Sequence, residues 1–144
     1  MSKRCDTLTV AVISLATLAM LSCAGQKSIS PDEIHSRIRS ANSLLTETDM
    51  LIDFARANRL TRNYAQGQAS YLQEEAGDLA TELEKSPPQQ RTQVAVDECR
   101  TQLERLIHEL SSIRGGIGHD NELAQSKARL TDIRQHLLHA DSSL

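Results

Sequence analysis

The chain has 144 residues and a formal net charge of −3, and charged residues make up 24% of it. This mildly acidic balance argues against a nucleic-acid partner, which favours a basic surface. The aromatic residues are only Phe54, Tyr64 and Tyr71, so the chain has little with which to stack on bases or sugars, and its core must come from aliphatic side chains.

The amino-terminal segment has the layout of an export signal. Lys3 and Arg4 precede an uncharged apolar stretch over residues 8–21, and a serine then stands directly before Cys23. A basic start, an apolar centre and a small residue before the cleavage point are typical of secretory signal peptides. The apolar stretch is also shorter than the roughly 20 residues that a membrane-spanning helix needs. We therefore expect residues 1–22 to be a signal peptide that is removed.

Cys23 follows the run Met-Leu-Ser and resembles the lipobox cysteine of bacterial lipoproteins. The resemblance covers residues 1–23, with methionine where the family usually has leucine three places before the cysteine. It implies that Cys23 is acylated and that the lipid holds the mature protein on a membrane. Because Ala24 rather than aspartate follows, the resemblance also implies the periplasmic face of the outer membrane. An ordinary secreted protein and an uncleaved anchor are the alternatives.

The mature chain is long enough for one domain. Residues 23–29 are expected to form a short lipidated tether, which at full stretch reaches about 20 Å and holds a helical domain over residues 30–144 close to the membrane. Cys99 would then be a lone thiol, because Cys5 leaves with the signal and Cys23 carries the lipid. Its position on an apolar stripe predicts burial, with pairing between molecules as the alternative.

A first helix is predicted from Pro31 to near Asn58. Ser30 and Glu33 form a capping box around a proline at the first helical position. Asn58 tolerates the left-handed conformation that often ends a helix. The apolar stripe of this helix alternates steps of four and three and consists of Ile34, Ile38, Ala41, Leu45, Thr48, Ile52 and Ala55.

Three further helices are predicted, from about Thr61 to Lys85, from about Pro88 to Arg114, and from near Asp120 or Asn121, both good caps, towards the carboxyl terminus. Proline at 87 and 88 and glycine at 115, 116 and 118 separate them. Their stripes are Ala65, Ala69, Leu72, Ala76, Leu79 and Leu83 in the first, Val96, Cys99, Leu103, Leu106, Leu110 and Ile113 in the second, and Leu123, Leu130, Ile133, Leu137 and Ala140 in the third.

These four stripes predict an all-α protein, an antiparallel up-down four-helix bundle about 40 Å long with coiled-coil-like packing. The joint at residues 58–61 contains neither glycine nor proline. One long helix over residues 31–85, packed with two shorter helices, is therefore the alternative.

No catalytic constellation and no cofactor motif is found in the sequence, so we expect neither an enzyme nor a cofactor. His136 and His139 lie three residues apart near Asp132 and Asp141, but two histidines do not specify a metal site, and a solvated helix face is the favoured interpretation. A periplasmic metal- or ligand-binding sensor that uses these histidines remains the alternative function.

Arg56, Arg59 and Arg62 are the most prominent basic group. Steps of three would make them neighbours on a helix, and the bundle places them at the end farthest from the tether, beside the glycine-rich turn at 115–118. They are a candidate docking surface for an acidic envelope protein or an anionic polymer. The simpler interpretation is that arginines suit the carboxyl end of a helix electrostatically.

The leading hypothesis is a non-enzymatic, lipid-anchored helical protein of the bacterial envelope. It would act by protein–protein interaction or as a structural or assembly factor, with an unknown envelope protein as partner, possible self-association and no nucleic acid. Pilot and assembly factors of secretion complexes include small helical lipoproteins, which is an analogy of architecture alone.

Overall fold

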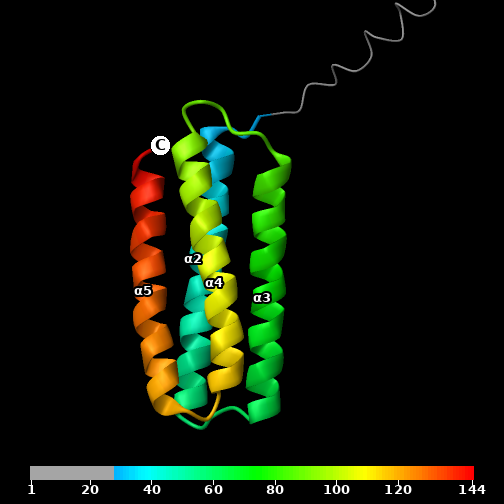
Figure 1. The fold of residues 1–144 in the computed structure, drawn as a ribbon, viewed down its shortest axis with the longest axis vertical. Coiled ribbons are helices and arrows are strands. Elements are labelled where there is room, and N and C mark those ends of the chain that lie inside the picture. Colours follow the sequence, from blue (N-terminus) through cyan, green and yellow to red (C-terminus); the bar gives the residue numbers. More distant parts are fainter. Residues whose placement is uncertain (1–27) are drawn as a thin grey trace, which may run out of the picture.

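The computed structural model describes residues 28–144 as four helices; the expected signal peptide, Cys23 and most of the expected tether lie outside the described residues. The helices are α2 (Pro31–Arg56), α3 (Arg62–Lys85), α4 (Gln93–Gly116) and α5 (Asp120–Ser142). They run alternately up and down, and α5 closes the bundle by packing against α2 (Figure 1). The predicted four-helix bundle is confirmed. None of these helices is long and apolar enough to cross a membrane.

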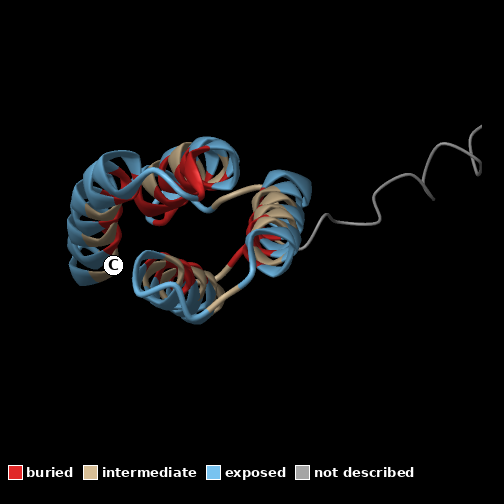
Figure 2. Ribbon diagram, turned by 90° about the horizontal axis from the view of Figure 1, so that it is seen from below, coloured by how far each residue is buried: buried red, intermediate tan, exposed pale blue. Residues whose placement is uncertain are grey.

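The core is the set of apolar stripes that the sequence predicts. Viewed end-on, the buried residues of all four helices face the centre of the bundle (Figure 2). Every residue of the predicted stripes is buried apart from Ala55, which is half-buried. The core extends beyond the stripes to Ile29, Leu51, Ala95 and Ile117.

The first helix starts and stops where local chemistry predicts. The Ser30 hydroxyl accepts a hydrogen bond from the Glu33 amide at 3.3 Å, and the Glu33 carboxylate accepts one from the Ser30 amide at 2.8 Å. After α2 ends at Arg56, Asn58 takes a left-handed φ of 53°. The Thr61 hydroxyl then caps α3 by accepting from the Tyr64 amide at 3.3 Å. This break excludes the alternative of one helix over residues 31–85.

One predicted helix start and one predicted helix cap are wrong. α4 begins at Gln93 rather than near Pro88, because Pro88 bridges to Ile29 and the Thr92 hydroxyl closes a turn by accepting from the Gln89 amide at 3.0 Å. Ile29, expected in the tether, is instead buried, and its amide donates to the carbonyl of residue 87 at 3.0 Å. α5 begins at Asp120, as predicted, but its cap residue is His119 rather than Asp120 or Asn121.

The two ends of the bundle differ in what they carry. Residues 28–30, the α3–α4 connection and the carboxyl terminus gather at one end, which we call the tether end (Figure 1). The loops at residues 57–61 and 117–119 meet at the opposite end, which we call the distal end. The distal end therefore lies a full helix length, about 40 Å, from residues 28–30.

Candidate interaction surface

The structure brings Arg56, Arg59 and Arg62 to the distal end, but they do not share one helix. Arg56 is held by α5: its Nε lies 2.6 Å from Asp120 Oδ1 and its Nη2 lies 3.2 Å from Asp120 Oδ2. This paired hydrogen bond lowers the pKa of Asp120 and raises that of Arg56. It also explains why Asp120 does not cap α5, since its carboxylate is directed to α2.

The other two arginines lie over and beside the loops of the distal end. The Arg62 guanidinium covers Gly118, where φ is 101° and an added Cβ would come within 2.7 Å of Nη2. The Arg59 side chain is exposed and forms no hydrogen bond or ion pair with any other described residue, although the Arg59 amide donates to the Phe54 carbonyl at 2.9 Å. Of the three arginines in the predicted docking group, Arg56 thus has a structural role, and Arg59 is the most available to a partner.

Of the two histidines on α5, His136 belongs to a polar network. His136 Nδ1 lies 3.0 Å from Glu98 Oε1 on α4. From Glu98 the network continues through Gln102 and Arg105 to Asp132, with contacts of 2.8, 2.8 and 2.6 Å. Arg105 lowers the pKa of Asp132 through its hydrogen bond. These contacts link α4 to α5.

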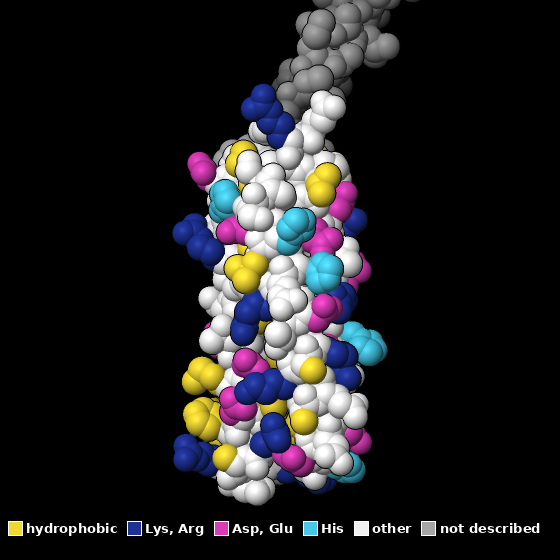
Figure 3. Space-filling model, turned by 90° about the vertical axis from the view of Figure 1, so that its left-hand side faces the viewer, with side chains coloured by type: hydrophobic (Ala, Val, Ile, Leu, Met, Phe, Trp, Pro, Cys, Tyr) yellow, Lys and Arg dark blue, Asp and Glu magenta, His cyan; other side chains and the backbone are white. Residues whose placement is uncertain are grey.

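His139 is exposed, and the face centred on α5 carries interspersed acidic, basic and histidine side chains (Figure 3). Within residues 28–144, no group of three or more histidine, cysteine or acidic side chains is arranged to hold a metal ion.

The predicted burial of Cys99 is confirmed. Its side chain is fully buried in the core, and that burial raises the pKa of its thiol to about 12. A thiol that stays protonated at neutral pH is a poor nucleophile and a poor metal ligand. Cys99 is therefore a core residue and not a reactive site.

All three aromatic side chains of this chain are exposed, and none belongs to the core. The exposed fractions are 37% for Phe54, 59% for Tyr64 and 52% for Tyr71, and nearby Met50 is 51% exposed. Aromatic residues are usually the largest contributors to a core. Their position outside the core, along the groove between α2 and α3, is the most unusual feature of the described surface.

Towards the distal end, this groove opens into a hollow of about 260 Å³, which we call the apolar hollow. Its walls come from the second half of α2, the 57–61 loop and the start of α3, and its lining residues are Glu47, Met50, Leu51, Phe54, Leu60, Tyr64 and Gln68. Five of these seven residues are apolar or aromatic, and the two polar ones are Glu47 on α2 and Gln68 on α3.

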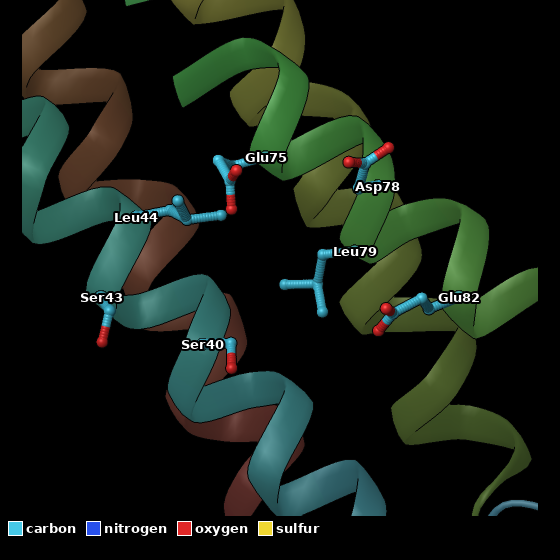
Figure 4. Close-up of a pocket in the computed structure, with 7 residues that line it drawn as sticks. All are labelled: Ser40, Ser43, Leu44, Glu75, Asp78, Leu79 and Glu82. Carbon is cyan, nitrogen blue, oxygen red and sulfur yellow. The ribbon is translucent and has the colours of Figure 1, made fainter. Parts of the chain in front are cut away.

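Towards the tether end, the same groove becomes the acidic hollow, of about 290 Å³ (Figure 4). Leu44 from α2 and Leu79 from α3 project towards each other at its centre. Glu75, Asp78 and Glu82 line the α3 side, and Ser40 and Ser43 the α2 side.

The carboxylates of the groove are largely unneutralised. Glu82 pairs with Arg37, but Glu47, Glu75 and Asp78 form no ion pair with any described residue. These negative charges act on their neighbours: the charge of Glu75 is the main reason that the pKa of Tyr71 is raised. We call the acidic hollow, the apolar hollow and Tyr71 together the α2/α3 seam.

The sequence analysis missed the seam, although a signal for it is present. The α3 edge consists of Tyr64, Gln68, Tyr71, Glu75, Asp78 and Glu82, each one residue before a member of the core stripe. The α2 edge consists of Ser40, Ser43, Glu47, Met50 and Phe54, with the same alternation of three and four. These two edges together contain every aromatic residue of the chain, and an exposed surface rich in aromatic residues is typical of a contact surface.

No protein-family model, curated protein or solved structure matches this chain. The chemistry of the seam is therefore the basis for a functional assignment. Small-molecule sites are usually enclosed pockets of about 300–1,000 Å³. Both hollows of the seam are smaller and open to solvent, which favours a macromolecular partner over a small ligand.

Proposed function

We propose that this chain is a lipid-anchored protein of the bacterial envelope that binds another protein through the α2/α3 seam, as a docking or assembly factor and not as an enzyme. One observation carries the proposal: Met50, Phe54 and Tyr64 line the apolar hollow, Tyr71 lies close enough to Glu47 and Glu75 to feel their charges, and all four side chains are exposed. Aromatic residues and methionine are enriched at protein interfaces, and buried aromatic anchors supply most of the binding energy there.

The arrangement of the bundle supports binding away from a membrane. At 1.5 Å per residue, Met50 lies about 30 Å along α2 from Ile29. With an acylated Cys23 only a few residues before Ile29, the tether end would face the bilayer and the apolar hollow would project into the periplasm. A partner in the periplasm could then reach the seam without contacting lipid.

The anchor is tested by the lipid on Cys23. We expect wild-type chain produced in a bacterial host to incorporate labelled palmitate and to fractionate with the outer membrane. Cys23→Ser should abolish both, because the lipobox cysteine is the only acceptor that the resemblance implies. Equal labelling of the two proteins would contradict lipid attachment at this residue.

The seam is tested by photocrosslinking in the full-length chain. A photoreactive amino acid is placed at Met50 or Tyr71, and at Leu138 as a matched control, because Leu138 is 55% exposed but lies on α5. We expect the same partner polypeptide to be crosslinked from both seam positions and not from Leu138. Capture from Leu138 alone, or no capture from either seam position in the native host, would contradict the proposed function.

A further inference from the structure

We propose that the seam binds a cationic amphipathic helix of the partner protein, which lies lengthwise between α2 and α3. This inference rests on the proposed function and specifies the chemistry of the partner. The helix would place apolar side chains in the apolar hollow and lysine or arginine side chains over the carboxylates of the acidic hollow.

The length of the seam fits a helix. It follows α2 from Ser40 to Phe54 and α3 from Tyr64 to Glu82, which at 1.5 Å per residue correspond to about 21 and 27 Å. A helical segment of about 14–18 residues covers this distance. A partner in extended conformation would bind through backbone hydrogen bonds to the edge of a sheet. The seam offers no such edge, because both of its sides are helices whose backbone groups are already hydrogen-bonded.

The spacing of the seam residues also fits a helix. Both edges repeat at intervals of three and four residues, so the side chains form two parallel ridges with a groove between them. A third helix packs into such a groove through apolar residues at positions i, i+3, i+4 and i+7. Met50, Phe54 and Tyr64 are placed to contact such anchors at the distal end of the groove.

The charge of the seam selects a cationic helix. Glu47, Glu75 and Asp78 have no cationic partner among the described residues, and Arg37 neutralises only Glu82. A helix that covers these carboxylates removes part of their water, which is unfavourable unless opposite charges replace it. Lysine and arginine supply those charges, and complementary charge also selects the partner and speeds association.

A second copy of this chain fits the seam less well. In a symmetric dimer both copies use the same surface. A parallel arrangement would bring acidic hollow against acidic hollow, including Glu75 and Asp78 of each copy. An antiparallel arrangement would cover each acidic hollow with the other copy's apolar hollow and leave the carboxylates without cations.

The experiment selects, from a displayed peptide library, the peptides that bind the full-length chain in a nonionic detergent. The displayed library contains helical peptides of about 18 residues with apolar residues fixed at three–four spacing and flanking positions randomised among Lys, Arg, Glu, Gln and Ser. We expect enrichment of Lys and Arg over Glu at the flanking positions. The enriched peptides should bind the double variant Glu75→Lys, Asp78→Lys about tenfold more weakly or worse, a loss of about 1.4 kcal/mol or more.

Two matched variants control for charge and exposure. Glu104→Lys reverses an exposed charge on α4, and Leu138→Glu alters an exposed apolar residue on α5, so both should bind the enriched peptides as the wild type does. The far-ultraviolet circular dichroism of each variant checks that the bundle is folded. Met50→Glu, which places a charge in the apolar hollow, should lose binding.

Several outcomes would overturn the inference. Enrichment of neutral or acidic peptides, no enrichment, or equal binding to the seam variants would each exclude a cationic helix as occupant. A dimer of the full-length chain that Met50→Glu dissociates would assign the seam to self-association. If crosslinking from Met50 and Tyr71 still yields a partner while the peptide selection fails, the proposed function stands and only the nature of the occupant is wrong.

Discussion

Tyr71 and Leu72 are neighbours on α3 with different expected roles. Substituting each in turn distinguishes a residue of the seam from a residue of the core. Leu72 is fully buried, whereas Tyr71 is 52% exposed. Leu72→Ala removes a fully packed side chain and is expected to cost about 2–5 kcal/mol of unfolding free energy. Tyr71→Ala removes a mostly solvated ring and introduces a better helix former, so its cost should be within about 0.5 kcal/mol.

For a domain of this size, 1 kcal/mol corresponds to roughly 3–5 °C in melting temperature. Thermal unfolding of the full-length chain in nonionic detergent, followed by circular dichroism, should therefore show a decrease on the order of 10 °C for Leu72→Ala and about 2 °C or less for Tyr71→Ala. Crosslinking from Met50 should show the reverse, with capture lost in Tyr71→Ala and retained in Leu72→Ala below its melting temperature. If Tyr71→Ala lowers the melting temperature as much as Leu72→Ala does, the ring is structural and our reasoning about the seam is wrong.

Three other predictions concern the bundle itself. Arg129→Met should lower the free energy of unfolding, measured in urea, by about 1–3 kcal/mol. The reason is that the Glu109 carboxylate, whose side chain is 9% exposed, loses the guanidinium 2.6 Å away. The double variant Arg129→Met, Glu109→Leu should recover most of that loss. Burial raises the pKa of Cys99 to about 12, so the folded state keeps a proton that the unfolded state releases near pH 9. Stability should therefore fall between about pH 9 and 12, and Cys99→Ala should make that fall less steep. At Asn58, where φ is 53°, substitution by Ala should cost about 1 kcal/mol and substitution by Gly should be neutral or stabilising, which thermal unfolding measures directly.

The fold is predictable from the sequence because burial of apolar stripes dominates it. The residues of α3 and α4 that alternate by four and three, such as Leu72 and Leu103, are all in the core. The end of α2 is predictable for a similar local reason, since Asn58 adopts the left-handed conformation at low cost. These features depend on the character of single residues and on their spacing.

Features that depend on pairing across the bundle were not predictable. The start of α4 depends on Pro88 meeting Ile29, and the cap of α5 depends on Asp120 being held by Arg56. Both contacts join segments far apart in the sequence. For the same reason the sequence could offer Arg56 only as a candidate docking residue beside its helix-end role, whereas the structure pairs it with Asp120 of α5.

The candidate site was only partly predictable. Arg59 is available at the distal end as expected, but the seam emerges only when the α2 and α3 edges lie side by side. The positions of Phe54, Tyr64 and Tyr71 outside every core stripe were a usable signal in the sequence. Their convergence on one groove required the packing of α2 against α3.

The central claim, that the seam is covered by a protein in the cell, is tested most directly by hydroxyl-radical footprinting of the unmodified chain. Methionine and aromatic side chains react readily, so Met50, Phe54, Tyr64 and Tyr71 report on the seam without substitution. We expect all four to be oxidised in the purified full-length chain and to be protected in native envelopes, while Leu138 reacts equally in both. Equal oxidation of the four seam residues in the two preparations would contradict the account.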